Sequence, residues 1–221
     1  MKKVLKITAW MLTVFLCINA TAQKQFAEGI LQYNISIVSS KSEASALNSL
    51  NGAVLSVYLK PSASRTEMKS SLGVESTVFD NKSGNGFILK EYSGQKLMIT
   101  MTKDNWNQKN QLFRNLRFTI DNTTQKIAGF SCKKATAKLE NGKDFVVYFT
   151  PDVVPSTKEY SNAFQNLPGV PVQYELESGN LKFTYTLTEI NYDNIPSVKF
   201  SIPKTGFRVM TYDENQQLKK G

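Results

Sequence analysis

The chain has no histidine and only two cysteines among its 221 residues. Without histidine there is no Ser-His or Cys-His nucleophile pair and no imidazole ligand for a metal. Cys17 and Cys132 are too far apart in sequence for a CxxC redox motif or a cysteine zinc cluster. Phosphate-binding loops of the GxxxxGK[ST] and GxGxxG types are also absent. We therefore expect no cofactor and no metal, and we interpret the protein as a non-enzyme.

Paired carboxylates are the one catalytic arrangement that these absences leave open, as in a glycoside hydrolase. Glu175, Glu177 and Glu189 supply enough acidic groups. Glu175 and Glu177, however, alternate with apolar residues, which is the pattern of charges on the wet face of a strand. A carboxylate-based hydrolase stays an alternative, without a favoured pair of residues.

The N-terminus has the pattern of a cleavable export signal. Three lysines within the first six residues precede an uncharged, mostly apolar run over 7–16, and Ala20-Thr21-Ala22 provides a cleavage site. A membrane-spanning helix needs about 20 apolar residues, roughly twice this run. Lipid attachment at Cys17 is a further alternative, but the bulky Leu16 just before it is unfavourable. We predict a signal peptide over 1–22, cleavage between Ala22 and Gln23, and a location in the periplasm or outside the cell, with peripheral attachment to the outer membrane as one form of it.

The remaining chain has the size of one domain, which we place at 23–212 with a flexible polar tail at 213–221. Removal of three of the 27 basic residues leaves 24 against 18 acidic ones, a net charge of +6. This charge is scattered along the chain, as on a solvated surface, so a nucleic-acid partner is not expected. Cys132 has no partner left for a disulfide, and we interpret it as a small buried residue, with a reactive or dimer-forming thiol as the alternative.

Alternation of apolar and polar residues dominates this part of the sequence and indicates a sheet with one buried and one wet face. It occurs over residues 31–37, 55–59, 172–176, 181–188 and 198–202. Gly179 lies in the short turn between the third and fourth of these runs, which therefore predict a hairpin. Further strands are expected near 64–70, 74–80, 86–92, 95–102 and 116–121.

A second hairpin is centred on Asn141-Gly142, a pair that suits the two positive-φ positions of a type I′ turn. A two-residue turn places Lys138 opposite Phe145. Both faces of this hairpin then carry apolar side chains, so a helix, a loop or a ligand must cover the second face.

Two segments predict helices through a Ser-x-x-Glu capping box and a terminal glycine, over 40–52 and 156–168. Trp106 follows an apolar strand, and we expect it to fold over the edge of the sheet rather than serve as a ligand anchor. The overall prediction is a mainly β fold, a single curved antiparallel sheet of about ten or eleven strands, or half-barrel, with one or two short helices on its concave face.

Three segments resemble exported bacterial proteins of unknown function in the DUF4412 and GLPGLI groups. The run Ile127 to Ala135, IAGFSCKKA, is similar to their IAGYxCKKA motif, and the run from Leu167 to Glu175 is similar to their LPGxPxxYE segment. Residues 145–152 fit their VWYTxD strand. The resemblance implies a fold like that of the periplasmic lipoprotein carriers of the Lol type, a curved half-barrel closed by helices and loops. It implies no reaction and no catalytic residue.

The resulting functional hypothesis is a non-catalytic binding protein of the cell envelope. Its concave face would hold a lipid, an acyl chain or a lipoprotein, or a peptide strand. The candidate lining residues are Tyr148, Phe164, Leu167, Tyr174, Phe183 and Tyr185. The alternative is a structural or protein-interaction module with a solid core and no small ligand, in which these six residues are ordinary core. The sequence predicts no oligomeric state.

Overall fold

The computed structural model describes residues 23–39, 50 and 52–219. Within them, one large sheet contains twelve strands in the order β14-β7-β6-β5-β4-β3-β2-β13-β12-β10-β9-β8. The strands are β2 (Gly29–Ser39), β3 (Val54–Leu59), β4 (Ala63–Ser70), β5 (Gly73–Asp80), β6 (Gly86–Tyr92), β7 (Gln95–Met101), β8 (Thr119–Ile127), β9 (Phe130–Lys138), β10 (Asp144–Thr150), β12 (Val170–Ser178), β13 (Leu181–Asn191) and β14 (Arg208–Thr211). Neighbouring strands are antiparallel except β14, which pairs with β7 in parallel. The short strands β1 (Lys24–Phe26) and β11 (Val153–Pro155) form a separate parallel pair.

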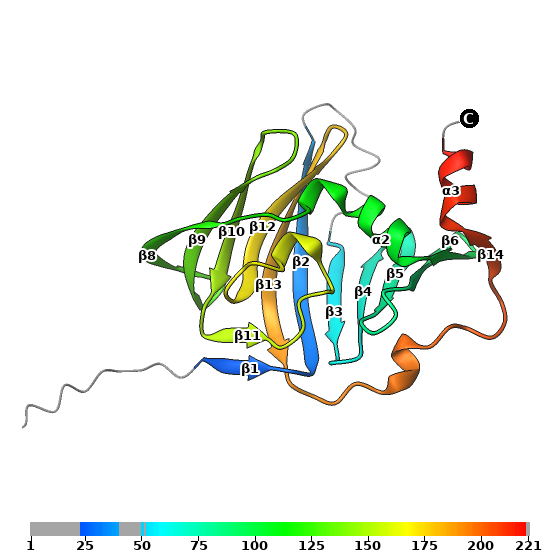
Figure 1. The fold of residues 1–221 in the computed structure, drawn as a ribbon, viewed down its shortest axis with the longest axis horizontal. Coiled ribbons are helices and arrows are strands. Elements are labelled where there is room, and N and C mark those ends of the chain that lie inside the picture. The colour runs from blue at the N-terminus through cyan, green and yellow to red at the C-terminus, as the bar shows by residue number, and fades with distance from the viewer. Residues whose placement is uncertain (1–22, 40–49, 51, 220–221) are drawn as a thin grey trace, which may run out of the picture.

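The sheet is curved and open, and short helical segments cross one of its faces, as Figure 1 shows. These segments are helix α2 (Lys103–Lys109) and the 3-10 turns η1 (Gln111–Phe113) and η2 (Asn162–Phe164). We call the face that they cover the inner face and the opposite one the outer face. The mainly β fold with a curved, open sheet is therefore as the sequence predicted, and the parallel β14 makes the sheet mixed rather than purely antiparallel.

Alternation of apolar and polar residues correctly located the strands whose outer face contacts solvent. In β2, Leu31, Tyr33 and Ile35 are buried on the inner face. In β13, Leu187 lies opposite Tyr33 and is fully buried with it. The expected strands near 64–70, 74–80, 86–92 and 95–102 correspond to β4 to β7 within one or two residues.

The hairpin β9–β10 has a different register from the predicted one. Lys138 lies opposite Asp144, not Phe145, because the loop has three residues and ends at Gly142 with φ +80°. A three-residue loop that ends in a left-handed glycine is the next commonest hairpin after the two-residue type. A shift of one residue exchanges the two faces of a strand. Phe145, Val147 and Phe149 consequently share the inner face with Ala135 and Ala137. The outer face combines Val146 and Tyr148 with polar partners on β9 such as Lys134 and Thr136.

The helix predicted over 156–168 is wrong. Its carboxylate Glu159 accepts hydrogen bonds from Thr157 and from the amide of Lys158, so it does not cap a helix. The amide of Ser156 donates instead to the carbonyl of Phe26 and extends the β1–β11 pair. Ser161 is extended (φ −156°), and only the turn η2 follows it.

The expected strand over 198–202 is also wrong, because this segment contains the 3-10 turn η3 (Ser197–Phe200). Pro196 and Pro203 flank it, and proline supplies no amide for a ladder. The chain reaches the sheet only at β14.

The tail expected to be flexible forms helix α3 (Tyr212–Leu218), where Thr211 and Glu214 make a capping box. The threonine hydroxyl accepts from the amide of Glu214, and the glutamate accepts from the amide of Thr211. Sequence inspection assigned these residues to a frayed end because so few of them are apolar.

The predicted signal peptide over 1–22, with Cys17 and Ala22, lies outside the described residues, and so does nearly all of the helix expected over 40–52. Among the residues that are described, no helix is long and apolar enough to cross a membrane.

Candidate functional site

A cavity of about 280 Å³ lies on the inner face, between the sheet and the segments that cover it. It is lined by Leu55, Val57, Thr66, Met68, Glu75, Thr77, Trp106, Lys109, Asn110, Tyr160, Ser161, Phe164, Tyr174, Leu176 and Tyr185. The sheet supplies its floor through β3 to β5, β12 and β13, and the covering segments supply its roof. This volume is near the lower end of the usual range for small-molecule sites.

Aromatic side chains form one wall of the cavity. Tyr174 stacks on Tyr185 with ring centroids 4.8 Å apart, and Phe164 meets Tyr174 edge to face at 4.8 Å. These contacts arise because Tyr174 and Tyr185 are direct cross-strand partners on the inner face. Burial raises the pKa of both tyrosine hydroxyls, so both stay neutral and the wall carries no charge at neutral pH.

Charged groups gather at the other end of the cavity. The carboxylate of Glu75 lies 3.2 Å from the ammonium of Lys90 and accepts a hydrogen bond from the Tyr92 hydroxyl at 3.1 Å. Burial, the Glu75 charge and this hydrogen bond raise the pKa of Tyr92 to about 12.

Lys109, at the C-terminal end of α2, stands near this group and makes no ion pair among the described residues. Its side chain is exposed at the surface, yet the surrounding protein removes enough water to lower the pKa of its ammonium, an effect that Glu75 opposes. Glu75 is paired with Lys90, so Lys109, with Lys219 nearby, leaves this end of the cavity with a net positive charge.

The six residues proposed from the sequence fall into three groups. Phe164, Tyr174 and Tyr185 line the cavity. Leu167 is fully buried in the main core, and Phe183 is half-buried on the inner face outside the cavity lining. Tyr148 lies on the outer face, opposite Lys134 and Gln173.

Placement of Tyr148 among the lining residues was wrong because of the one-residue error in the β9–β10 register. The charged group of Glu75, Lys90 and Lys109 was not found from the sequence at all. Glu75 sits in an ordinary alternating strand, and only the order of strands in the sheet brings it near α2. An acidic residue at an inner-face position of β5 was the available signal.

Trp106 and Cys132, two other residues singled out from the sequence, are both buried. The ring of Trp106 stacks on that of Phe79 with centroids 4.4 Å apart, so it packs on the interior strand β5 rather than over the edge of the sheet as expected, and it also lines the cavity. Cys132 is fully buried in the main core, where burial raises the pKa of its thiol. Across the described residues, no group of three acidic or cysteine side chains is arranged to hold a metal ion.

No family model and no curated protein matches this sequence, so membership in the exported groups that it resembles is not shown. Among solved structures, it is similar to an uncharacterised conserved protein from Thermus thermophilus, with 13% identity, a TM-score of 0.45, and coverage of 83% of this chain and 90% of that one. Similarity to PNGF-II has 12% identity and a TM-score of 0.48, over 87% of this chain and 33% of the other. MucB matches with 10% identity and a TM-score of 0.31, over 83% of this chain and 60% of that one.

Proposed function

We propose that the chain is a non-catalytic binding protein of the cell envelope, and that its inner-face cavity holds the hydrocarbon chain of an amphiphile with an anionic end. A fatty acid, or an acyl chain carried by a lipid or a lipoprotein, has this chemistry. The observation that carries the proposal is the aromatic-walled cavity on the inner face, because a concave site with mostly apolar walls and a few polar groups is the usual form of a small-molecule site. The envelope location is supported by the export-signal pattern over residues 1–22.

The position of the charges suggests how such a ligand would lie. Its hydrocarbon would contact Phe164, Tyr174 and Tyr185, where no charge has to be desolvated. Its anionic end would point toward Lys109, which has no competing ion pair among the described residues. A carboxylate there gains a charge-assisted contact with the ammonium.

The first test is binding of a fluorescent fatty acid to the purified chain from Gln23 onward. Thr77→Trp should fill the cavity and weaken binding at least tenfold, because Thr77 lines it from β5. Thr184→Trp is the matched control, since Thr184 is a strand threonine on the outer face of β13, opposite Glu175. Equal affinity in the two variants, or no binding by the wild type, would overturn the proposal.

The second test concerns the anionic end. Lys109→Glu should weaken binding of a fatty acid and leave binding of the uncharged alcohol of the same length unchanged. An equal loss for both ligands would show that Lys109 does not face the head of the ligand.

A further inference from the structure

The hairpins β9–β10 and β12–β13 separate from each other at one end of the sheet. Strands β10 and β12 are paired from Val147 opposite Tyr174 to Thr150 opposite Val170. Residues 144–146 and 175–178 have no pairing with each other, although each segment stays paired with its own hairpin partner. We call this divergence the fork.

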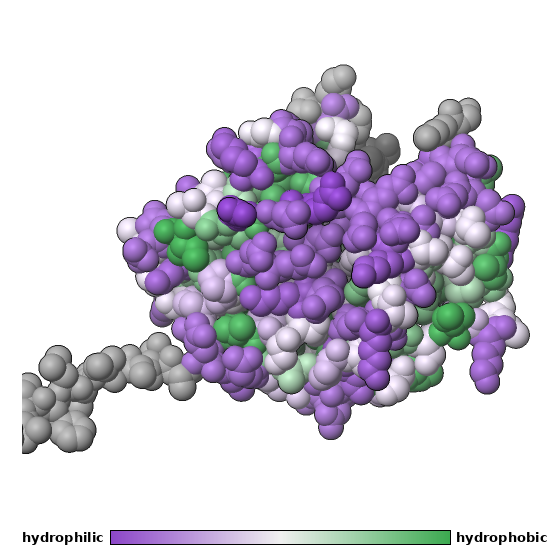
Figure 2. Space-filling view, viewed as in Figure 1, coloured by the Kyte–Doolittle hydropathy of each residue, from purple (hydrophilic) through white to green (hydrophobic). Residues whose placement is uncertain are grey.

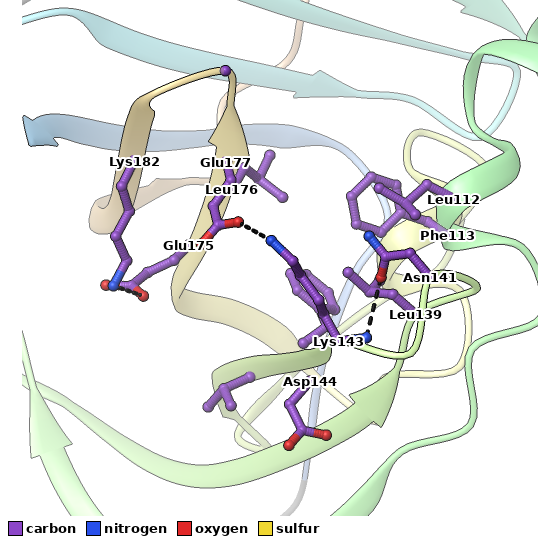
Figure 3. Close-up of a pocket in the computed structure, with 13 residues that line it drawn as sticks. Leu112, Phe113, Leu139, Asn141, Lys143, Asp144, Glu175, Leu176, Glu177 and Lys182 are labelled. Carbon is purple, nitrogen blue, oxygen red and sulfur yellow. Dashed lines mark hydrogen bonds and ion pairs between the residues drawn. The ribbon is translucent and has the colours of Figure 1, made fainter. Parts of the chain in front are cut away.

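The fork contains a pocket of about 500 Å³. Its apolar lining comes from Leu112, Phe113, Leu139, Phe145, Val146 and Leu176, most of which Figure 3 labels. Figure 2 shows apolar surface at the end of the molecule where the two hairpin tips lie, surrounded by hydrophilic side chains. Three different segments, η1, the β9–β10 hairpin and β12, therefore contribute apolar groups to one hollow.

The charged groups at the rim of the fork pocket neutralise one another. Lys143 bridges the fork to Glu177 at 2.7 Å, and Lys182 contacts Glu175 at 2.6 Å, as Figure 3 shows. Asp144, the remaining carboxylate of the lining, is paired with Lys138 at 2.8 Å. Among the described residues that line it, the pocket thus offers a ligand apolar contact and no unpaired charge, which suits an uncharged hydrocarbon.

The fork pocket and the inner-face cavity share a wall. Leu176 lines both of them. The ring of Phe145, in the fork pocket, stacks on that of Phe164, in the cavity, with centroids 6.2 Å apart. The Phe113 ring lies on its other side at a centroid distance of 5.4 Å, so aromatic rings connect the two spaces. Leu176 is only partly buried, and no backbone pairing between β10 and β12 closes the sheet beside it.

We propose that the fork pocket takes the far end of the same hydrocarbon chain whose first part lies in the inner-face cavity, so that the protein selects long chains over short ones. This inference rests on the proposed function. It adds a second compartment, reached past Leu176, and makes chain length the property by which the protein discriminates between ligands.

Affinity as a function of chain length tests this inference, with octanoate, dodecanoate and hexadecanoate as displacing ligands. Each methylene that enters an apolar compartment should tighten binding up to about fourfold. Leu139→Trp and, independently, Leu112→Trp should fill the fork pocket, abolish the gain from dodecanoate to hexadecanoate and leave octanoate affinity unchanged. Leu72→Trp, in the exposed β4–β5 turn, is the matched control and should keep the full gain.

The outcomes separate the two proposals. If none of the three acids binds, the proposed function fails. If octanoate binds but hexadecanoate gains nothing over dodecanoate, or if the gain survives in both fork variants, the fork pocket is only a surface hollow and this inference is overturned. Circular dichroism and a melting curve of each variant distinguish a filled pocket from a misfolded chain.

Discussion

The two halves of the sheet are covered in different ways. Strands β4 to β7 and β14 are packed on both faces: Trp106 and Tyr212 cover the inner face, and Phe200 and Phe207 cover the outer face. The other half, from β3 through β2 and β13 to β8, has a largely polar outer face, and its inner face is covered by turns such as η2. The first half is a filled sandwich of layers, and the second is a one-sided sheet with an irregular roof.

This difference explains where the cavity lies. Long helices cover a sheet evenly, whereas short 3-10 turns present few side chains in a regular array. The cavity opens where the roof changes from α2 to η2, at the junction of the two halves. Both halves contribute to its lining: Thr66 and Thr77 come from the doubly covered half, and Tyr174 and Tyr185 come from the one-sided half.

Substitution of one phenylalanine in each half should give the largest contrast. Phe79→Ala removes a ring that is 7% exposed and stacked on Trp106, and we expect a loss of about 3–5 kcal/mol in the free energy of unfolding. Phe183→Ala, on the inner face of β13, removes a half-buried ring and should cost less than about 2 kcal/mol. Urea denaturation measures both values. Equal losses would contradict the division into a filled and an open half.

The outer layer of the filled half depends on a buried ion pair, and its removal should have the next largest effect. Arg65 donates to Glu67 at 2.6 Å and to the carbonyl of Lys199 at 3.0 Å, and so ties the segment before β14 to the sheet. Glu67→Gln leaves the guanidinium without its counter-charge and should cost about 2–4 kcal/mol. Replacing both residues, as Arg65→Met with Glu67→Leu, should recover most of that loss. A double variant as unstable as the single one would show that the packing, not the lost charge, was at fault.

The pH dependence of this cost has a definite sign. Burial alone would raise the pKa of Glu67, but the guanidinium of Arg65, together with the ammonium groups of Lys199 and Lys69, outweighs it and holds the pKa below its ordinary value of 4.5. The pair therefore stabilises the fold above that pH, and its contribution is lost as the pH falls through the lower folded-state value. The stability difference between wild type and Glu67→Gln should shrink as the pH falls below about 4.5. A difference that is constant from neutral to acid pH would contradict this origin.

The open half was the easier one to predict from the sequence, because a sheet with one wet face alternates strictly between polar and apolar residues. Residues 31–37 of β2, 172–177 of β12 and 181–188 of β13 follow this rule. In the filled half, Phe87, Ile88 and Leu89 are consecutive and all buried, so periodicity shows a strand there but not which face is inner.

The errors share a physical cause, which is that tertiary contacts override local patterns. A loop of three residues instead of two moved Tyr148 to the outer face. The capping-box pattern at Ser156 did not start a helix, because Ser156 is engaged by strand β1. The aromatic wall of the candidate site could be predicted in part, since Tyr174 and Tyr185 are apolar positions of alternating strands and Phe164 belongs to a covering segment that packs on them. Its charged end depends on strand order, which periodicity does not encode.

The smallest expected effect concerns the tyrosines of the open half at high pH. Burial raises the pKa of Tyr174 well above 10.0 in the folded protein, and the same holds for Tyr33. Below about pH 10 both hydroxyls are protonated whether the chain is folded or not, so they add no pH dependence. Above it the unfolded chain binds fewer protons than the folded one, and stability falls by about 1.4 kcal/mol per pH unit for each such tyrosine.

Tyr174→Phe should therefore reduce the slope of the alkaline fall in stability by the contribution of one tyrosine, about 1.4 kcal/mol per pH unit. Tyr192→Phe, at an exposed tyrosine, serves as the matched control and should follow the wild-type curve. Urea denaturation from neutral pH to about pH 11 measures the slopes. Identical slopes for Tyr174→Phe and the wild type would mean that the aromatic wall admits enough water to ionise Tyr174 in the folded state. The cavity beside it would then be wet rather than apolar, and the contrast between the two halves would lose its functional meaning.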